Sequence, residues 1–521
     1  MKTRRILSYI AIAVMLVGMV GLFSGCTPKT EEKEGYVNIA ILFPGFTIES
    51  DYKYRQQVED AINEKLEKDL GFKISVTPTS YIDQYETMFA LDLAQKTAYD
   101  FMRTSNGAIS SYAEKGVVVD LKPLINQYAP WMWDLIPEQA WAECTLNGKV
   151  YGVPTCSFPI SYGMWFRGDW LEKLGMEKPT SMAELEALCQ AILDSDEINA
   201  NGNVVPMAGH RDILEQVFLG MFTEHPGDYV DENGNVQPKY FDPGYRDFVE
   251  KMAEWYQKGY IDDLVLNGDE NTINNLLAQN IVGIHVANVY QLEYSIMNSY
   301  NTQNNLNMQW SIPFASDTKT YYSSGFGTDI IAFPATGRNT EQAFQFFAWY
   351  YNNQENSDLV LYGVEGLTYT RSTDPETGKE ILSLPESEKT DTVNTYSDLM
   401  GFFGCNTYTE LQLKYTYHTR PAESSRAYDS CNTQEILQNC HLDVTKYFQV
   451  TLPTDIGTKS GDSRNLAIST ISDMIVGKIP SNDETWAQFR ANWEALGGKE
   501  VYEYFTTLYN EAKADLEFLQ K

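Results

Sequence analysis

The sequence has few of the residues on which enzymes and metal sites most often depend. Only five histidines and seven cysteines occur among its 521 residues, and the histidines are scattered. It has no HExxH pair, no GxSxG elbow and no phosphate-binding glycine loop. We therefore expect no catalytic residue, no cofactor and no metal. One enzymatic alternative stays open, because any two of the 71 acidic side chains could form the carboxylate pair of a glycan-cleaving enzyme.

Positive charge is also scarce. The chain has 39 Lys and Arg against 71 Asp and Glu. Residues 1–25 hold three of the basic residues and no acidic one, so the remainder has 36 basic and 71 acidic residues and a net charge of −35. A surface this acidic has no electrostatic attraction for phosphate backbones or anionic lipid heads. We expect no nucleic-acid partner.

Cysteine is too sparse for a disulfide scaffold. Six cysteines follow Cys26 in a long chain, and no CxxC pair indicates zinc. Structural thiols are the favoured interpretation. Cys431 and Cys440 are the best candidates for a bridge if the compartment is oxidising.

The N-terminus has the order of a secretory signal. Lys2, Arg4 and Arg5 precede an apolar stretch at 6–23, and small residues lead to Cys26. The segment resembles a bacterial lipoprotein signal at 1–25, which implies that Cys26 carries acyl chains such as palmitate. Residues 26–35 then form a tether, and the protein is lipid-anchored on the extracytoplasmic face of the cell membrane. A single transmembrane anchor is the alternative.

The mature part begins with the pattern of a parallel α/β sheet. A short apolar run at 37–43, alternation at 72–78 and the segment 98–102 predict strands, and the patterns at 54–70 and 88–95 predict helices between them. Ligand loops are expected at the carboxyl edge of such a sheet. Because 496 residues follow position 25, we expect two or more lobes. Capping boxes at 181–184 and 481–484 predict two helix starts further along.

Four stretches, in order, are similar to one family, the extracytoplasmic solute-binding lipoproteins that supply ABC importers of sugars and oligosaccharides. They are LNGKVYGVP at 146–154, MWFRGDWLEKLG at 164–175, GTDIIAFP at 327–334 with YGVEG at 362–366, and MIVGKIP at 474–480. Their order and spacing extend across nearly the whole mature chain.

The resemblance implies a two-lobed α/β fold of the periplasmic-binding-protein type II, whose chain crosses the hinge several times. By analogy, 36–152 and 322–372 form the N-lobe, while 153–321 and 373–521 form the C-lobe. Some family members have a calcium loop where this chain has 196–206. The later acidic ligands are missing here, so a plain turn at Asn199–Asn203 is favoured over calcium binding. At 231–235 a hairpin turn is likewise favoured over a metal loop.

A sugar cleft needs flat aromatic rings for the CH faces and amides or arginine for the hydroxyls. Such side chains follow the predicted strands and crossings. The candidate ligand-binding residues are Phe46, Tyr52, Asn106, Phe158, Tyr162, Trp165, Arg167, Asn288, Tyr290 and Phe326.

Each candidate has a structural alternative. Alternation at 162–167 places Trp165 and Arg167 opposite Phe166, and we expect Phe166 in the core with Trp165 nearer the cleft. Arg167 is equally suited to bind Asp169 or a chain end. Asn106 could cap a helix. Core or surface packing is the favoured alternative for three aromatic residues. These are Tyr52, Tyr290 and Phe326.

We expect a monomeric binding lipoprotein that captures a carbohydrate, with an oligosaccharide favoured, between its lobes and delivers it to the permease subunits of an ABC transporter. A peptide or another polar solute is the first alternative ligand, with Arg103 or Arg167 as partner for its carboxylate. Two different functions also stay open. One is a surface enzyme acting on glycans, and the second is a sensor or adhesive lipoprotein without a permease.

Overall fold

The computed structural model describes the chain with several gaps. The described residues are 33–44, 52–81, 84–136, 138–155, 160–292, 301, 303–314, 320–323, 329–351, 353–373, 375, 378, 380–383, 385, 422–431, 433–448 and 450–519. Cys26 and the expected signal and tether up to residue 32 lie outside them. None of the helices in these ranges combines the length and apolar character needed to cross a membrane.

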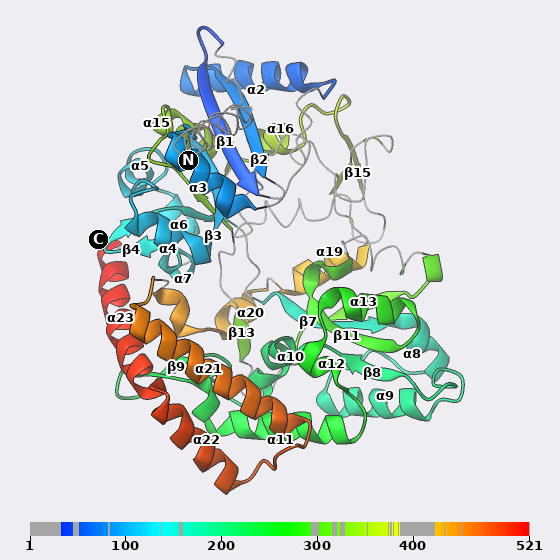
Figure 1. Ribbon diagram of the computed structural model, residues 1–521. Helices are drawn as coiled ribbons and strands as arrows, with labels where there is room; N and C mark the ends of the chain where they lie inside the picture. The colour runs from blue at the N-terminus through cyan, green and yellow to red at the C-terminus, as the bar shows by residue number, and fades with distance from the viewer. Residues whose placement is uncertain are drawn as a thin grey trace, which may run out of the picture.

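The N-lobe is the upper body in Figure 1 and is built on a five-stranded mixed sheet in the order β2-β1-β3-β14-β6. β1 pairs in parallel with β2 and β3, whereas β14 runs antiparallel to β3 and β6. The strands are β1 (Val37–Pro44), β2 (Ile74–Tyr81), β3 (Phe101–Ser105), β6 (Val153–Thr155) and β14 (Asp329–Ala332).

Helices cover the N-lobe sheet, and their apolar faces form one core with the strands. Ile41 of β1 and Phe347 of α15 are both fully buried in it. The helices are α2 (Arg55–Leu70), α3 (Tyr85–Gln95), α4 (Asn106–Glu114), α5 (Lys122–Tyr128), α6 (Met132–Leu135), α7 (Glu138–Ala142), α15 (Thr340–Tyr351) and α16 (Gln354–Leu361). Two hairpins are added, β4 (Thr145–Leu146) with β5 (Lys149–Val150) and β15 (Thr370–Thr373) with β16 (Glu380–Ser383).

The C-lobe, the lower body in Figure 1, is built on a four-stranded sheet in the order β12-β7-β11-β8. Its strands are β7 (Tyr162–Arg167), β8 (Val205–Ala208), β11 (Val282–Asn288) and β12 (Met308–Ser311). Both faces of this sheet are covered. Phe166 lies in a core with α11 and α21, and Trp165 lies in a separate core with α13 and α19.

Many helices surround this second sheet. The α-helices are α8 (Gly168–Leu174), α9 (Met182–Asp194), α10 (Arg211–Phe218), α11 (Pro243–Gln257), α12 (Leu264–Asn267), α13 (Glu270–Ala278), α19 (Ala422–Cys431), α20 (Gln434–Asn439), α21 (Thr454–Ile475) and α22 (Asp483–Ala495). The shorter elements are the 3-10 turns η1 (Leu219–Met221), η2 (Lys239–Phe241) and η3 (Val289–Leu292), and the hairpin β9 (Tyr229–Val230) with β10 (Val236–Gln237).

Four elements lie where the lobes meet. β13 (Tyr321–Ser323) pairs in parallel with β17 (Cys440–Leu442), and η4 (Val444–Tyr447) follows directly. The long helix α23 (Gly498–Leu519), red in Figure 1, runs from α21 and α22 of the C-lobe to β4 and α7 of the N-lobe. The lobes are therefore joined by side-chain packing as well as by the chain crossings.

The predicted order of the first strands and helices is confirmed, with shifted bounds. α2 ends at Gly71, whose φ of 81° is left-handed and whose N–H donates to the Glu67 carbonyl at 2.9 Å. The third strand begins three residues later than predicted, at Phe101. β6 belongs to the N-lobe sheet although it lies just beyond the expected boundary at 152.

The two predicted capping boxes differ from the structure in detail. Ser181 caps α9 by accepting from the Glu184 N–H at 3.3 Å, as expected, and the Glu184 carboxylate accepts from the Thr180 N–H at 2.8 Å. For α22 the predicted cap is wrong. The N-cap is Asn482, which accepts from the Thr485 N–H at 2.9 Å.

The cysteines that the structure describes are free thiols. The interpretation as structural thiols is confirmed for them, and a bridge between Cys431 and Cys440 is not formed. Burial raises the pKa of Cys431 to about 12 and that of Cys440 to about 11, which leaves both protonated and unreactive at neutral pH. Cys156 and Cys405 lie outside the described residues.

Candidate functional site

Several strands of the N-lobe sheet end at one edge of the sheet, the edge that faces the C-lobe. Pro44 pairs with Tyr81, so β1 and β2 end together. Asp329, where β14 begins, pairs with both Ser105 and Thr155, so β3 and β6 end at the same edge. The chain leaves the N-lobe sheet and returns to it at this edge.

The C-lobe sheet presents a matching edge. Asn288 at the end of β11 pairs with Tyr162 at the start of β7, and β8 ends beside β11 because Ala208 pairs with His285. The chain between Thr155 and Tyr162 joins the two edges directly. Because ligands of open α/β sheets bind at the carboxyl ends of strands, we assign the candidate ligand site to the space between these edges.

The C-lobe edge carries three partly exposed candidates. The Asn288 Oδ1 accepts from the Tyr290 N–H at 2.9 Å, which fixes the turn after β11. The Tyr290 ring packs at 5.4 Å and 52° against Tyr428, so one face of the ring is supported by α19. Tyr162 is half-buried at the start of β7. An amide and two phenol rings are thereby held at one end of the sheet.

Trp165 and Arg167 occupy less accessible positions than we expected. Trp165 is fully buried, packs at 4.9 Å against Trp310 and donates its indole N–H to the Asn288 carbonyl at 3.0 Å. Its expected place nearer the cleft is therefore wrong, whereas the core position of Phe166 is confirmed.

The Arg167 guanidinium binds Asp169, which was the structural alternative to binding a ligand. It donates to both carboxylate oxygens of Asp169, at 2.9 and 2.5 Å, and to the Asn280 Oδ1 at 2.6 Å. Only 4% of the residue is exposed, so this arginine has little surface to offer a ligand. Trp165 nevertheless acts on the site indirectly, because it holds the Asn288 backbone.

The remaining candidates fall on the N-lobe side or outside the described residues. Tyr52 is buried, with its ring edge-on to Tyr54 at 5.8 Å, which is its core alternative. Asn106 opens α4 directly after β3, and Ser105 rather than Asn106 is the N-cap residue. Three candidates lie outside the described residues. They are Phe46, Phe158 and Phe326.

His210 is a residue of this edge that the sequence analysis missed. It follows β8 and caps α10, with its Nδ1 accepting from the Asp212 N–H at 3.3 Å. Its side chain is 36% exposed, so the imidazole adds a polar group at the end of β8, the strand next to β11. A signal was available, because a glycine and a polar residue between a short apolar run and an amphipathic helix indicate a helix start at a strand end.

A hollow of about 410 Å³ lies along the open edge of β12. Two charged side chains form hydrogen bonds with the backbone groups of Trp310 there. Lys178 donates to the Trp310 carbonyl at 2.5 Å, and the Trp310 N–H donates to Glu423 at 2.7 Å. These bonds block the addition of another strand to this edge.

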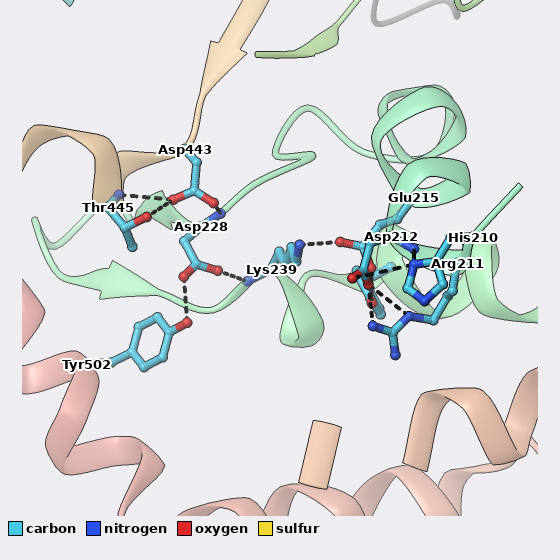
Figure 2. A network of polar contacts seen from close by, with 10 residues as sticks. His210, Arg211, Asp212, Glu215, Asp228, Lys239, Asp443, Thr445 and Tyr502 are labelled. Carbon is cyan, nitrogen blue, oxygen red and sulfur yellow. Dashed lines mark hydrogen bonds and ion pairs between the residues drawn. The ribbon is translucent and has the colours of Figure 1, made fainter. Parts of the chain in front are cut away.

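A polar network links Asp228 to Lys239, Asp443 and Tyr502 (Figure 2). Asp228 accepts from the Lys239 N–H at 3.0 Å and from the Tyr502 hydroxyl at 2.5 Å. Asp443 accepts from the Asp228 N–H at 3.3 Å. Burial, and then the neighbouring Asp443 charge, raises the pKa of Asp228 to about 7. Lys239 is also bonded to Glu215, which lowers the positive charge available to the two aspartates.

Potential metal-ligating side chains are dispersed over the described residues. Nowhere in them do three or more His, Cys, Asp or Glu side chains gather as a metal site requires. In the loop at 196–206, where some family members bind calcium, Asn199 bonds within the loop. Its Oδ1 accepts from the Val204 N–H at 3.2 Å. The predicted hairpin at 231–235 is confirmed, with Asp231 Oδ1 accepting from the Asn233 and Asn235 N–H groups at 2.9 Å.

Known proteins similar to this chain include bacterial solute-binding proteins. The family model for bacterial extracellular solute-binding proteins matches residues 49–357. The polygalacturonan/rhamnogalacturonan-binding protein YtcQ of Bacillus subtilis (strain 168) is 21% identical over 383 residues, which cover 71% of this chain and 72% of YtcQ. The fructooligosaccharide ABC transporter substrate-binding protein FusA of Streptococcus pneumoniae is 22% identical, over 50% of this chain and 54% of FusA.

A solved structure supports the architecture. A solute-binding protein from Bifidobacterium longum infantis, described as HMO-binding and ABC-transporter-associated, superposes with a TM-score of 0.62. The superposition covers 92% of this chain and 99% of that chain at 16% identity. At this identity the likeness concerns the fold, which is two-lobed as expected.

Proposed function

The chain belongs to the family of bacterial extracellular solute-binding proteins, and on this premise we propose that it captures a carbohydrate between its lobes for an ABC importer. The ligand class we propose is an oligosaccharide. The protein holds this ligand until the closed lobes meet the permease subunits, and it performs no chemistry on it.

The observation that carries this proposal is the set of side chains at the C-lobe edge. Tyr162 and Tyr290 offer phenol rings, Asn288 offers an amide, and His210 offers an imidazole. Pyranose and furanose rings have apolar CH faces and hydroxyl rims, which fit aromatic rings and planar polar groups. YtcQ and FusA are named for binding polygalacturonan or rhamnogalacturonan and fructooligosaccharides, which supports a glycan over a peptide.

The same proposal includes the location and the lobe organisation. Cys26 would carry the lipid anchor after removal of 1–25, and 26–35 would be the tether of a monomer on the extracytoplasmic face of the cell membrane. The division into an N-lobe of 36–152 with 322–372 and a C-lobe of the rest stays a proposal, with the first boundary moved past β6 and the last past β16. Closure about the crossings would bring the two sheet edges onto the ligand.

The test is a thermal-shift and calorimetric screen of the chain from residue 27 onward. The panel contains fructooligosaccharides, galacturonides, milk oligosaccharides, monosaccharides and short peptides. A ligand that binds only the folded protein raises its stability by about 2.7 kcal/mol at a hundredfold excess over Kd. Binding of one glycan class is the expected result. Binding of peptides alone would contradict the proposed ligand.

Two variants locate the site once a glycan is found. Tyr290→Ala is expected to weaken binding about tenfold or more, because a stacking face supported by Tyr428 is lost. Tyr256→Ala is the matched control, since this tyrosine lies on α11 and bonds Asp263 at 2.8 Å, away from the sheet edge. Equal affinities of the two variants would place the ligand elsewhere.

A further inference from the structure

The chain at 440–448 connects the two lobes by its side chains. Leu442 is buried in the N-lobe core, and Tyr447 packs against that core. Between them, Asp443 bonds the C-lobe through the Asp228 N–H, and the Val444 N–H donates to the Asp228 carbonyl at 3.1 Å. Neighbouring residues of one short segment are therefore fixed to different lobes.

α23 is fixed to the same point. Its Tyr502 donates to Asp228, and its Phe505 packs at 5.3 Å against Phe448. Further along the helix, Tyr509 packs edge-on at 5.7 Å against Tyr447. Since α23 also contacts β4 and α7 of the N-lobe, Asp228 is the C-lobe residue on which both connecting segments converge.

The charges around this carboxyl do not balance. Asp228 and Asp443 are each less than a tenth exposed, and Lys239 of η2, the cation beside them, is already paired with Glu215 of α10. The next ion pair, Arg211 with Asp212, is neutral as a unit. Two ionised aspartates would therefore repel each other in a medium of low dielectric constant.

Among the described residues, the elements packed around the pair also contribute tyrosine and histidine side chains. β13 contributes Tyr322, whose pKa is raised by burial, and η2 contributes Tyr240, whose pKa burial raises to about 12. β17 contributes His441, which contacts the Asp228 carbonyl at 3.2 Å and whose pKa is lowered by burial. His225 lies beyond it, 5.9 Å from the His441 ring and bonded to Asp242.

We propose that Asp228 and Asp443 form a proton-dependent latch between the lobes. While the Asp228 carboxyl keeps its proton, 440–448 stays docked on the C-lobe. Loss of that proton to solvent leaves like charges on Asp228 and Asp443, loosens this docked segment and favours separated lobes. The regulatory meaning rests on the proposed function, because it would make ligand affinity higher in mildly acidic surroundings than in alkaline ones.

The test is hydrogen–deuterium exchange of the ligand-free protein from about pH 6 to about pH 8.5, corrected for intrinsic exchange. Protection of 226–230 and 440–448 is expected to fall about tenfold through a transition near the pKa of Asp228. Small-angle X-ray scattering over the same series should show the radius of gyration increase. A flat profile of both would overturn the latch.

Conservative variants separate the latch from general loosening. Asp228→Asn should abolish the transition. Asp443→Asn should move it to lower pH because a repelling charge is removed, and Tyr502→Phe should move it to higher pH because a donor to the ionised form is lost. Asp262→Asn is the matched control, since Asp262 is a partly buried C-lobe aspartate whose pKa burial also raises, and it should behave as wild type.

The outcomes are independent of the ligand. Transitions that move in the same direction for Asp443→Asn and Tyr502→Phe, or that persist in Asp228→Asn, would refute the latch even if glycans bind. A normal set of transitions in a protein that binds no glycan would instead contradict the proposed function and leave the latch standing.

Discussion

His285 should make the C-lobe sensitive to mild acid. It lies in the middle of β11, is fully buried, and neither ring nitrogen has a hydrogen-bond partner among the described residues. Burial lowers its pKa from 6.5 to about 3, so the folded protein keeps the ring neutral while an unfolded chain binds a proton below pH 6.5. The contribution of His285 to the free energy of unfolding is therefore fully present above pH 6.5 and is lost as the pH falls.

The size of the effect follows from the shift. Each pKa unit corresponds to about 1.36 kcal/mol, so lowering the pH from about 8 to about 5 should remove about 2 kcal/mol through this one group. His285→Leu removes the titration while keeping an apolar side chain of similar size. The cost of this substitution in packing is the same at both pH values. The difference in free energy of unfolding between wild type and variant should therefore change by about 2 kcal/mol between pH 8 and pH 5.

Urea unfolding monitored by tryptophan fluorescence at the two pH values measures this double difference. His210→Leu serves as control for the loss of a histidine, because that imidazole is 36% exposed whereas His285 is fully buried. The reasoning is refuted if wild type and His285→Leu differ by the same free energy of unfolding at pH 8 and at pH 5.

Two further predictions concern packing and the polar network. Gly163→Ala should cost about 1–3 kcal/mol, because its Cβ would lie 2.5 Å from the Ser311 carbonyl and 2.7 Å from the Trp310 ring; thermal unfolding with no loss of stability would contradict the close packing of β7 on β12. The pKa of Asp228 is raised from 3.8 to about 7, so wild-type protein loses stability as the pH rises between these values. Relative to wild type, Asp228→Asn should therefore be more stable at pH 8 than at pH 5 by about 3 kcal/mol. Urea unfolding at both pH values measures this difference, which should have the opposite sign from that of His285.

Local patterns were sufficient for the first elements of the N-lobe but not for every boundary. The third strand was predicted at 98–102, and Tyr99 in this range is buried although it lies before the strand. Asp100 instead makes a corner before the strand, with its carboxylate accepting from the Ala40, Arg338 and Asn339 N–H groups. Two of these partners are more than 230 residues away, so no local signal marks the corner.

The candidate site was harder to predict because both faces of the C-lobe sheet are buried. Alternation along β7 was interpreted as one core face and one cleft face, with Trp165 on the latter. In a sheet covered on both sides, alternation separates two cores and says nothing of exposure. The partners of Asp228 lie at Asp443 and Tyr502, far along the chain, so the network had no sequence signal at all.

The arrangement of the two sheets has a consequence for how the molecule is built. β7, β8, β11 and β12 all lie between β6 and β14, so the C-lobe sheet is an insertion into the N-lobe sheet. The ends of the insertion are neighbours, since Thr155 pairs with Asp329. During synthesis β3 must therefore keep a bare edge until β14 emerges, well over 200 residues later. An unpaired strand edge is a site for wrong pairing with another chain, so this edge is at risk while the chain is being made.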